Sequence, residues 1–331
     1  RRPPRSTRFP YTTLFRSGVA EGVRKFLCRS MKEWTTNLEC GGQHLAKVDI
    51  KRGIFQGDSL SQLLFIICLI PLSVMLREAK HGYQLNRSTS GKVNHQFYMG
   101  DLKLHESNKS QLESLVQTVR IFTQDIRMRF GIQKCATIVL KRGKKETDDG
   151  ILLPDGEMMK DLGDDGYKYL GVLEASEIKT KEMKEKVRSE YTRRVKLLLE
   201  SKLNGGNVIK AINTWVVAVL RYSGGILDWT QDELKCIDRK TRKLMTINRA
   251  LHPRANVARL YLPRNEGGRG LRSAEETVRT EEHGLSDYIR CEEKGSNRLL
   301  KKLIKEKTKR EYQENQRATK EKEWKEKALH G

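Results

Sequence analysis

The sequence has few cysteines, no long apolar run and a low share of hydrophobic residues. Its six cysteines are scattered and none forms a CxxC pair. This spacing argues against a zinc site or a disulfide framework, and for reduced thiols in the cytosol or nucleus. The longest apolar run, Leu63–Leu72, contains Pro71 and is shorter than the ~18 residues of a membrane span. We find no signal peptide, so we expect a nuclear or cytoplasmic protein with no membrane partner.

Negative charge is scarce relative to positive charge. The chain carries 65 Lys and Arg against 42 Asp and Glu, which gives a net charge of +23. Such an excess favours a polyanionic partner, and nucleic acid is the first candidate. A soluble protein that is merely basic is the plainer interpretation, and charge alone leaves it open. Hydrophobic residues make up 37% of the chain, which is enough for a core over most of its length.

The first 17 residues differ from the rest. The segment Phe9–Ser17 (FPYTTLFRS) closely resembles the translation of a common sequencing adapter, and the residues before it show no periodicity. We therefore expect residues 1–17 to be a disordered artefact and exclude them from the fold. The natural reading frame is expected to begin near Gly18.

Residues 18–175 are typical of an α+β domain. Apolar residues recur at helical spacing in Val19–Trp34 and Gln111–Arg129, and Leu63–Lys80 is apolar enough for a buried helix. Segments with glycine turns between and after these helices predict hairpins at NLECGGQHLAKVDI, FYMGDLKLH and ILLPDGEMM. The segment YKYLGVL predicts a further strand. An antiparallel sheet packed against helices follows from this order.

From residue 176 onward the pattern is all helical. Thr230–Glu233 fits a capping box that starts a helix over Gln231–Ile247. We divide this part into a helical region, 176–250, and a helical connector with a basic charged tail, 251–331. Trp215 and Trp229 lie on apolar faces and are predicted to be core residues.

Basic side chains recur along the predicted helices of this second part. They form a candidate surface for a nucleic-acid duplex, with counterion release as the driving force. Solvated helix faces are the alternative. The residues are Arg193, Arg194, Lys196, Lys202, Lys210, Arg221, Arg239, Lys240, Arg242 and Lys243.

Four motifs follow one another in the chain: RGIFQGDSLS (Arg52–Ser61), FYMGD, GIQKC and YKYLGV. Their order and spacing resembles the reverse transcriptases of non-LTR (LINE-type) retrotransposons. The later segment ARLYLPRNEGGRGL resembles a segment downstream of the thumb in the same group. Group II intron maturases and telomerases share the FYMGD-type hairpin. The resemblance covers nearly all of residues 18–331 and implies a partial polymerase palm followed by a helical thumb.

The first motif resembles the family's nucleotide-and-template loop. The resemblance assigns this role to Arg52, Gln56, Gly57 and Asp58. A glycine there lets the backbone approach a sugar or base that a side chain would block. The plainer interpretation is a loop that caps the following helix. Gln62 stands where the family has proline, a departure expected to affect helix-start rigidity rather than chemistry.

The second motif resembles the catalytic hairpin, whose family form is aromatic-x-Asp-Asp. Here the residues are Tyr98, Met99, Gly100 and Asp101, so Asp101 matches the second Asp and Gly100 replaces the first. Carboxylates in such a hairpin hold Mg²⁺ ions for phosphoryl transfer. We find no counterpart of the Asp that the family carries on an earlier strand. The resemblance therefore implies a Mg²⁺ site reduced to Asp101. A turn carboxylate that faces water is the plainer interpretation.

The last two motifs resemble nucleotide and primer contacts. Lys134 in GIQKC matches a lysine near the phosphates of the incoming nucleotide. YKYLGV (Tyr167–Val172) matches the primer-gripping hairpin at the base of the thumb, with Tyr169, Leu170 and Gly171 as the primer grip. A surface lysine and an ordinary strand are the alternatives. The resemblance implies an RNA template, a DNA primer and dNTPs as partners. We predict an RNA-directed DNA polymerase domain that is inactive in this copy, or else a non-catalytic nucleic-acid-binding remnant.

Overall fold

The computed structural model describes residues 19–50, 53–84, 92–128, 131–153, 156–163, 166–291, 324, 325 and 327. Its contacts divide the chain into two compact units, Arg1–Gly171 and Val172–Gly331. The adapter-like residues 1–17 and most of the predicted basic tail lie outside the described residues. The two units are taken separately below.

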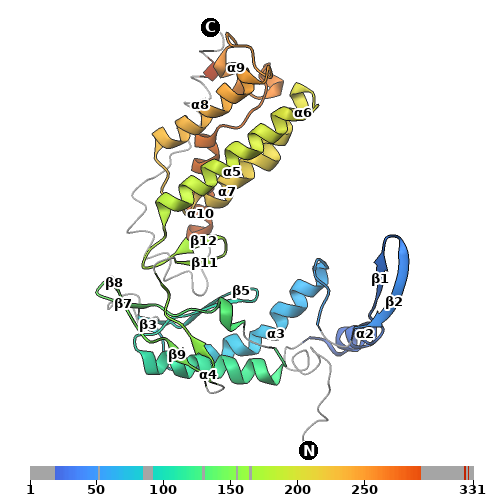
Figure 1. Cartoon of the computed structure of the whole chain (residues 1–331), viewed down its shortest axis with the longest axis vertical. Coiled ribbons are helices and arrows are strands. Elements are labelled where there is room, and N and C mark those ends of the chain that lie inside the picture. The colour runs from blue at the N-terminus through green and yellow to red at the C-terminus, as the bar shows by residue number, and fades with distance from the viewer. Residues whose placement is uncertain are drawn as a thin grey trace, which may run out of the picture. The chain divides into compact units, whose positions relative to one another are not determined.

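The first unit contains the helices α2 (Glu21–Lys32), α3 (Ser59–Glu78) and α4 (Lys109–Asp125). Helices α3 and α4 lie against each other in Figure 1 and share a small core. Leu72 and Leu76 of α3 meet Leu115, Val119 and Phe122 of α4 there. Both helices begin at a side-chain cap, Asp58 for α3 and Asn108 for α4, which satisfies an amide of the first turn.

The strands of the first unit pair two by two. The pairs are β1–β2 (Thr35–Cys40, Gln43–Asp49), β3–β4 (Tyr83–Gln84, Lys92–Val93), β5–β6 (His95–Tyr98, Asp101–Leu104), β7–β8 (Val139–Lys141, Lys144–Glu146) and β9–β10 (Ile151–Leu152, Met158–Met159). Each of these pairs is antiparallel. The three predicted hairpins are confirmed as β1–β2, β5–β6 and β9–β10. Helices and antiparallel pairs together make the chain α+β, and within the described residues the pairs do not join into a larger sheet.

The single strand predicted at YKYLGVL is wrong, and the hairpin that the resemblance implies there is present. The segment YKYLGVL forms two strands, β11 (Tyr167–Tyr169) and β12 (Val172–Glu174), rather than one. Leu170 and Gly171 take positive φ angles of 47° and 82°, and these angles end β11. The boundary between the two compact units falls at this turn.

Helix α3 is longer than the apolar run that the sequence displays. It spans 20 residues with a mean hydropathy of 2.2, which is long and apolar enough to cross a membrane. The estimate from Leu63–Leu72 alone missed this because the helix continues on both sides of that run. About a third of the apolar window is buried inside the protein, and core helices of soluble proteins pass the same test. The composition of α3 therefore decides nothing about a membrane.

The second unit is helical, with α5 (Thr180–Glu200), α6 (Gly205–Ala211), a π-helical turn (Ile212–Val216), α7 (Val217–Gly224), α8 (Gln231–Ile247), α9 (Val257–Tyr261), a 3-10 turn (Arg264–Glu266) and α10 (Ala274–Cys291). Its buried side chains form one core cluster. Trp229 is only 1% exposed, as predicted, but Trp215 is 41% exposed and is not a core residue. Trp215 lies in the π turn between the buried Ile212 and Val216, and the guanidinium of Arg194 covers its ring at 5.0 Å.

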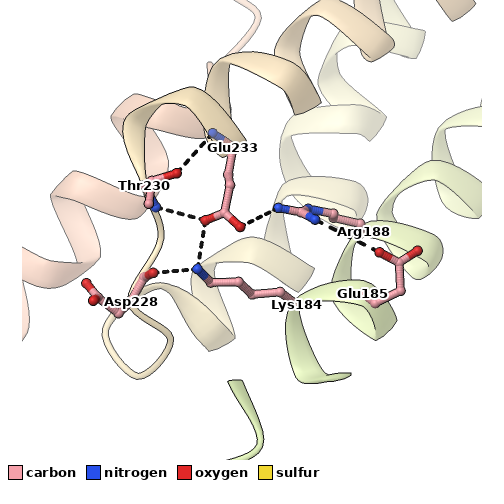
Figure 2. A network of polar contacts seen from close by, with 6 residues as sticks. All are labelled: Lys184, Glu185, Arg188, Asp228, Thr230 and Glu233. Atoms are coloured by element: carbon pink, nitrogen blue, oxygen red, sulfur yellow. Dashed lines mark hydrogen bonds and ion pairs between the residues drawn. The ribbon is translucent and has the colours of Figure 1, made fainter. Parts of the chain in front are cut away.

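The predicted capping box of α8 is confirmed and is part of a larger polar network (Figure 2). The Thr230 hydroxyl accepts from the Glu233 amide at 3.3 Å, and the Glu233 carboxylate accepts from the Thr230 amide at 2.9 Å. The same carboxylate accepts from Lys184 at 2.7 Å and from Arg188 at 2.6 Å, both on α5. Burial alone would raise the pKa of Glu233, but these hydrogen bonds and charges lower it to about 2. One residue thus caps α8 and joins it to α5.

Candidate active site

The β5–β6 hairpin carries the motif that resembles a catalytic hairpin. Phe97 and Leu102 are cross-strand partners, and both pack on the core between α3 and α4 together with Leu104. Burial of this face fixes the register, because a one-residue slip would turn the apolar side chains to water. Tyr98 pairs with Asp101 at the end of the ladder, so the tip is held on a packed base.

At the tip, Met99 rather than Gly100 takes the left-handed conformation, with φ at 51°. A Cβ atom built on Gly100 would meet the ring of Phe65 at 3.4 Å, which is ordinary van der Waals contact. The backbone therefore does not require glycine at this position, and a side chain would fit beside Phe65. Asp101 follows on β6 and is exposed. The hairpin presents one carboxylate where the family form has two.

The structure brings Asp101 near the segment that carries Lys134. The Tyr167 hydroxyl donates to the Lys134 carbonyl at 2.8 Å and joins β11 to the 3-10 turn Ile132–Lys134. Burial raises the pKa of Tyr167, and Cys135 and Asp101 add to the rise. Lys134 is exposed and lies in a 3-10 turn rather than at a strand start. The sequence reasoning did not identify Tyr167, although its two-residue spacing from Tyr169 places both on one face of a strand.

Tyr169, the first predicted primer-grip residue, also lies against the hairpin. The Lys103 ammonium of β6 sits 4.0 Å from the centre of the Tyr169 ring, a cation–π contact. Leu170 and Gly171 form the turn that follows. The second and fourth motifs, about 65 residues apart in the sequence, therefore meet in the folded unit. The spacing of the motifs in the sequence does not predict the contact between Lys103 and Tyr169, because such a contact depends on how the segments pack in the folded unit.

The predicted nucleotide-and-template loop is placed in part. Arg52 lies outside the described residues, Gln56 is exposed, and Gly57 has φ at 93° with open space around it. Asp58 is the cap of α3, because its Oδ2 accepts from both the amide and the hydroxyl of Ser61 at 3.0 Å. The structure therefore confirms that Asp58 caps the following helix. Its role in a nucleotide-and-template loop stays a prediction.

The hairpin has too few carboxylate side chains to form a magnesium site of the kind that the resemblance implies. Mg²⁺ prefers octahedral oxygen coordination, with carboxylates as its protein ligands. Among the described residues, no group of three or more His, Cys, Asp or Glu side chains could hold a metal ion. Asp101 is alone at the tip beside Gly100. The residues present do not fit the two-metal arrangement that the family implies.

The candidate duplex-binding residues of the second unit are in two situations. Some are already paired within the unit. Arg193 and Arg194 bind Glu190 at 2.7 Å, and Arg221 binds Glu281 at 2.7 Å. Arg242 donates to the Tyr261 hydroxyl at 2.7 Å. Hydrogen bonds from Arg193 and Arg194 lower the pKa of Glu190 to about 2. Others are exposed and remain candidates: Lys196, Lys202, Lys210, Arg239, Lys240 and Lys243.

The structure explains why the segment ARLYLPRNEGGRGL has glycine at position 268. A Cβ atom on Gly268 would collide with the Leu262 carbonyl, so only glycine fits there. Asn213, in the π turn, donates to the Gly270 carbonyl at 2.7 Å and accepts from the Arg272 amide at 2.9 Å. The segment is therefore folded tightly against the helix that contains the π turn.

Comparison with known proteins agrees with the motif order. Residues 15–173 match the family model "Reverse transcriptase (RNA-dependent DNA polymerase)". This segment, which includes nearly all of the first unit, is reverse transcriptase sequence.

A curated relative comes from a retrotransposable element. The chain is 28% identical over 160 residues to the retrovirus-related Pol polyprotein from type-1 retrotransposable element R2 of Popillia japonica. The match covers 47% of this chain and 26% of the relative, so the matched segment spans about a quarter of that polyprotein. The chain carries a reverse transcriptase domain of a non-LTR element.

Proposed function

We propose that this domain descends from an RNA-directed DNA polymerase and is catalytically defective in this copy. The main support for this proposal is the tip of the hairpin, where Gly100 precedes Asp101 and supplies no carboxylate. A two-metal site loses transition-state stabilisation when a ligand is lost, because the developing charge is no longer neutralised. The substrates of the parent activity would be an RNA template, a DNA primer and dNTPs.

The palm and thumb assignments belong to the same proposal. The packing of β5–β6 on α3 and α4 supports a partial palm in residues 18–175. The helical second unit supports a thumb over 176–250, followed by a connector and basic tail over 251–331. In this arrangement Lys134 would contact nucleotide phosphates, and Tyr169, Leu170 and Gly171 would contact the primer. The contacts of Tyr167 and Tyr169 with the neighbouring motifs support a common site.

Primer extension tests the loss of catalysis. The full chain is incubated with an RNA template, an annealed DNA primer, dNTPs and Mg²⁺ or Mn²⁺, beside the Asp101→Asn variant. We expect no incorporation above the level of Asp101→Asn. Incorporation by the wild type that Asp101→Asn abolishes would overturn the proposed defect.

Restoring the hairpin carboxylate gives a sharper version of this test. A Cβ atom at Gly100 stays 3.4 Å from the Phe65 ring, so we expect the Gly100→Asp variant to fold. We expect it to remain inactive, because the sequence shows no counterpart of the Asp that the family carries on an earlier strand. Recovered primer extension by this single change would show that the rest of the site is intact.

A second function, binding of nucleic acid without catalysis, is favoured by the surface of α8. Lys235, Arg239 and Lys243 are exposed at intervals of four residues, which aligns them along one face of the helix. Phosphate contacts made by such residues release counterions, so log Kd should change linearly with log salt. Titration of a labelled RNA–DNA hybrid at several salt concentrations tests this. Equal affinity at low and high salt would exclude the electrostatic mode.

A further inference from the structure

The second unit contains a cleft of about 550 Å³ at the side of α8. Its walls come from α8, α9, the beginning of α10 and the C-terminal residues Trp324 and Lys327, and they combine aromatic rings with charges of both signs. One ring belongs to Tyr261, whose hydroxyl accepts from Arg242 at 2.7 Å. Carboxyl groups of Asp232, Asp238 and Glu275 line the same space, together with the basic side chains of Lys235, Arg239 and Arg242. The cleft therefore offers an aromatic surface held by a hydrogen bond, with charged groups of both signs around it.

A residue far along the chain occupies this aromatic surface. The Trp324 ring stacks on the Tyr261 ring with centroids 5.5 Å apart and planes 21° from parallel. Trp324 is half-buried and packs against the core cluster of the second unit. Stacked aromatic pairs at this distance are attractive beyond the area they bury. A side chain from the C-terminal part of the chain thus forms part of the wall of the cleft.

Two polar contacts flank the stacked rings. The side-chain amide of Asn256 donates to the Lys327 carbonyl at 3.1 Å. Its oxygen accepts from the Ala258 amide at 2.8 Å, so one side chain both caps α9 and holds the C-terminal segment. Lys325 forms an ion pair with Glu266 at 3.1 Å. Lysines of the segment thereby meet a region of the unit that carries several carboxylates.

We propose that the Tyr261 side of this cleft is a docking site for Trp324, Lys325 and Lys327 of the same chain. Residue 291 ends α10 in that unit, and Trp324 contacts the same unit. The contacts described above are a ring stack, a hydrogen bond and a partly exposed ion pair, and a docking held by contacts of this kind is reversible. This inference is independent of the proposed polymerase ancestry.

The covalent connection makes such a weak contact sufficient. Thirty-two residues, 292–323, separate Cys291 from Trp324. A tether of this kind supplies an effective concentration on the order of millimolar. A contact of roughly millimolar strength is then substantially occupied within one chain, and a second molecule at micromolar concentration competes poorly. Occupancy by the same chain is therefore favoured over exchange between copies.

Zero-length crosslinking of the full chain tests the docking. A carbodiimide joins Lys325 to Glu266 only when the ion pair forms, and mass spectrometry of the digest quantifies the joined peptides. We expect the crosslink in the wild type and a fall of about tenfold in Trp324→Ala, since the stacked ring provides most of the contact. Trp215→Ala is the matched control, because it removes a tryptophan of the same unit outside the cleft; its crosslink should be unchanged.

Competition keeps the test independent of the stability of the variant. A synthetic peptide of residues 320–331 at millimolar concentration should reduce the crosslink in the wild-type chain. The same peptide with alanine in place of the tryptophan should not. An absent crosslink, an undiminished crosslink in Trp324→Ala, or equal effects of the two peptides would overturn the proposal. So would crosslinks found only between chains in a mixture of ¹⁴N- and ¹⁵N-labelled protein.

Discussion

The two units of this chain differ in how they bury apolar side chains. The described part of the first unit has three small clusters, one between α3 and α4, one between α4 and the β9–β10 hairpin, and one between α2 and α3. The second unit has a single cluster to which α5, α7, α8 and α10 all contribute. Burial of apolar area is the main stabilising term in folding. We therefore expect the second unit, whose core is continuous, to have the larger free energy of unfolding.

The motif residues and the continuous core lie in different units. The residues that resemble polymerase motifs lie in the unit with divided cores and short hairpins, where Asp101 and Lys134 are exposed. The helical unit has the partly buried network at the start of α8 and a cleft at the side of the same helix. Binding residues commonly lie on loops and strand ends held by a packed scaffold. Here that scaffold is the pair α3 and α4, and substitutions in each unit can test the difference.

The largest effect is expected from cavities in the two cores. Leu220→Ala in the second unit and Leu72→Ala in the first each remove a side chain that is at most 1% exposed. We expect about 2–5 kcal/mol of lost stability in each case, within the unit concerned. Of the four tryptophans, only Trp34 lies in the first unit, so tryptophan emission mainly reports the second. Thermal melts should show a lower emission midpoint for Leu220→Ala only. Equal shifts for both variants would mean that the units unfold together.

A large pH-dependent effect is expected in the second unit. Burial raises the pKa of Asp238 from 3.8 to about 7, against the opposing effect of its hydrogen bond with the Ala274 amide. Between these values the folded state keeps a proton that the unfolded state releases, so stability falls as the pH rises from about 4 to about 7. One pKa unit corresponds to about 1.4 kcal/mol, so the fall is a few kcal/mol.

Asp238→Asn should flatten this pH dependence, because the amide does not titrate. Emission-monitored unfolding in urea at pH 5 and pH 7.5 measures it for both proteins. The paired carboxylates Glu190 and Glu233, with pKa values of about 2, lose their contribution only at lower pH and do not interfere. A wild-type protein that is equally stable at both pH values would contradict the burial of an acid at this position.

A smaller effect is expected at the network that joins α5 to α8 (Figure 2). Glu233→Gln keeps the shape but removes the charge that Lys184 and Arg188 share. We expect a loss of about 1–2 kcal/mol, since charge-assisted hydrogen bonds and a helix cap are both weakened. The matched control is Glu185→Gln, whose carboxylate is 76% exposed and 4.0 Å from Arg188. Its midpoint should stay within error of the wild type, and an equal shift would remove the special role of Glu233.

The smallest effect on stability is expected on the exposed face of α8. The triple change of Lys235, Arg239 and Lys243 to Gln should leave the midpoint nearly unchanged, because exposed charges contribute little to folding. The same variant should bind an RNA–DNA hybrid more weakly and with a shallower salt slope. Fluorescence anisotropy at several salt concentrations measures both. Unchanged affinity would place the binding surface elsewhere.

The predictions that rested on local sequence patterns agree with the structure in most cases. The capping box at Thr230 and Glu233, the glycine turn of β1–β2 and the apolar periodicity of α4 depend on neighbours within one element, and each is present in the structure. The apolar pattern of YKYLGVL predicted a single strand wrongly, because Leu170 is not a residue that commonly signals a turn; the resemblance to a primer-gripping hairpin gave the two strands. Trp215 failed for a similar reason. A π turn changes the helical period, and so the face on which the side chain lies.

The sequence by itself determined the α+β class, the order of the motifs and the replacement of a carboxylate by Gly100, since these need only residue identity and spacing. Only the tertiary structure decided that a side chain fits at Gly100 beside Phe65, that Asp58 is committed to a helix cap, and that Tyr167 reaches Lys134. It also decided that Trp324 stacks on Tyr261. The physical reason is that contacts between distant segments depend on which surfaces are buried together, and spacing along the chain does not specify that.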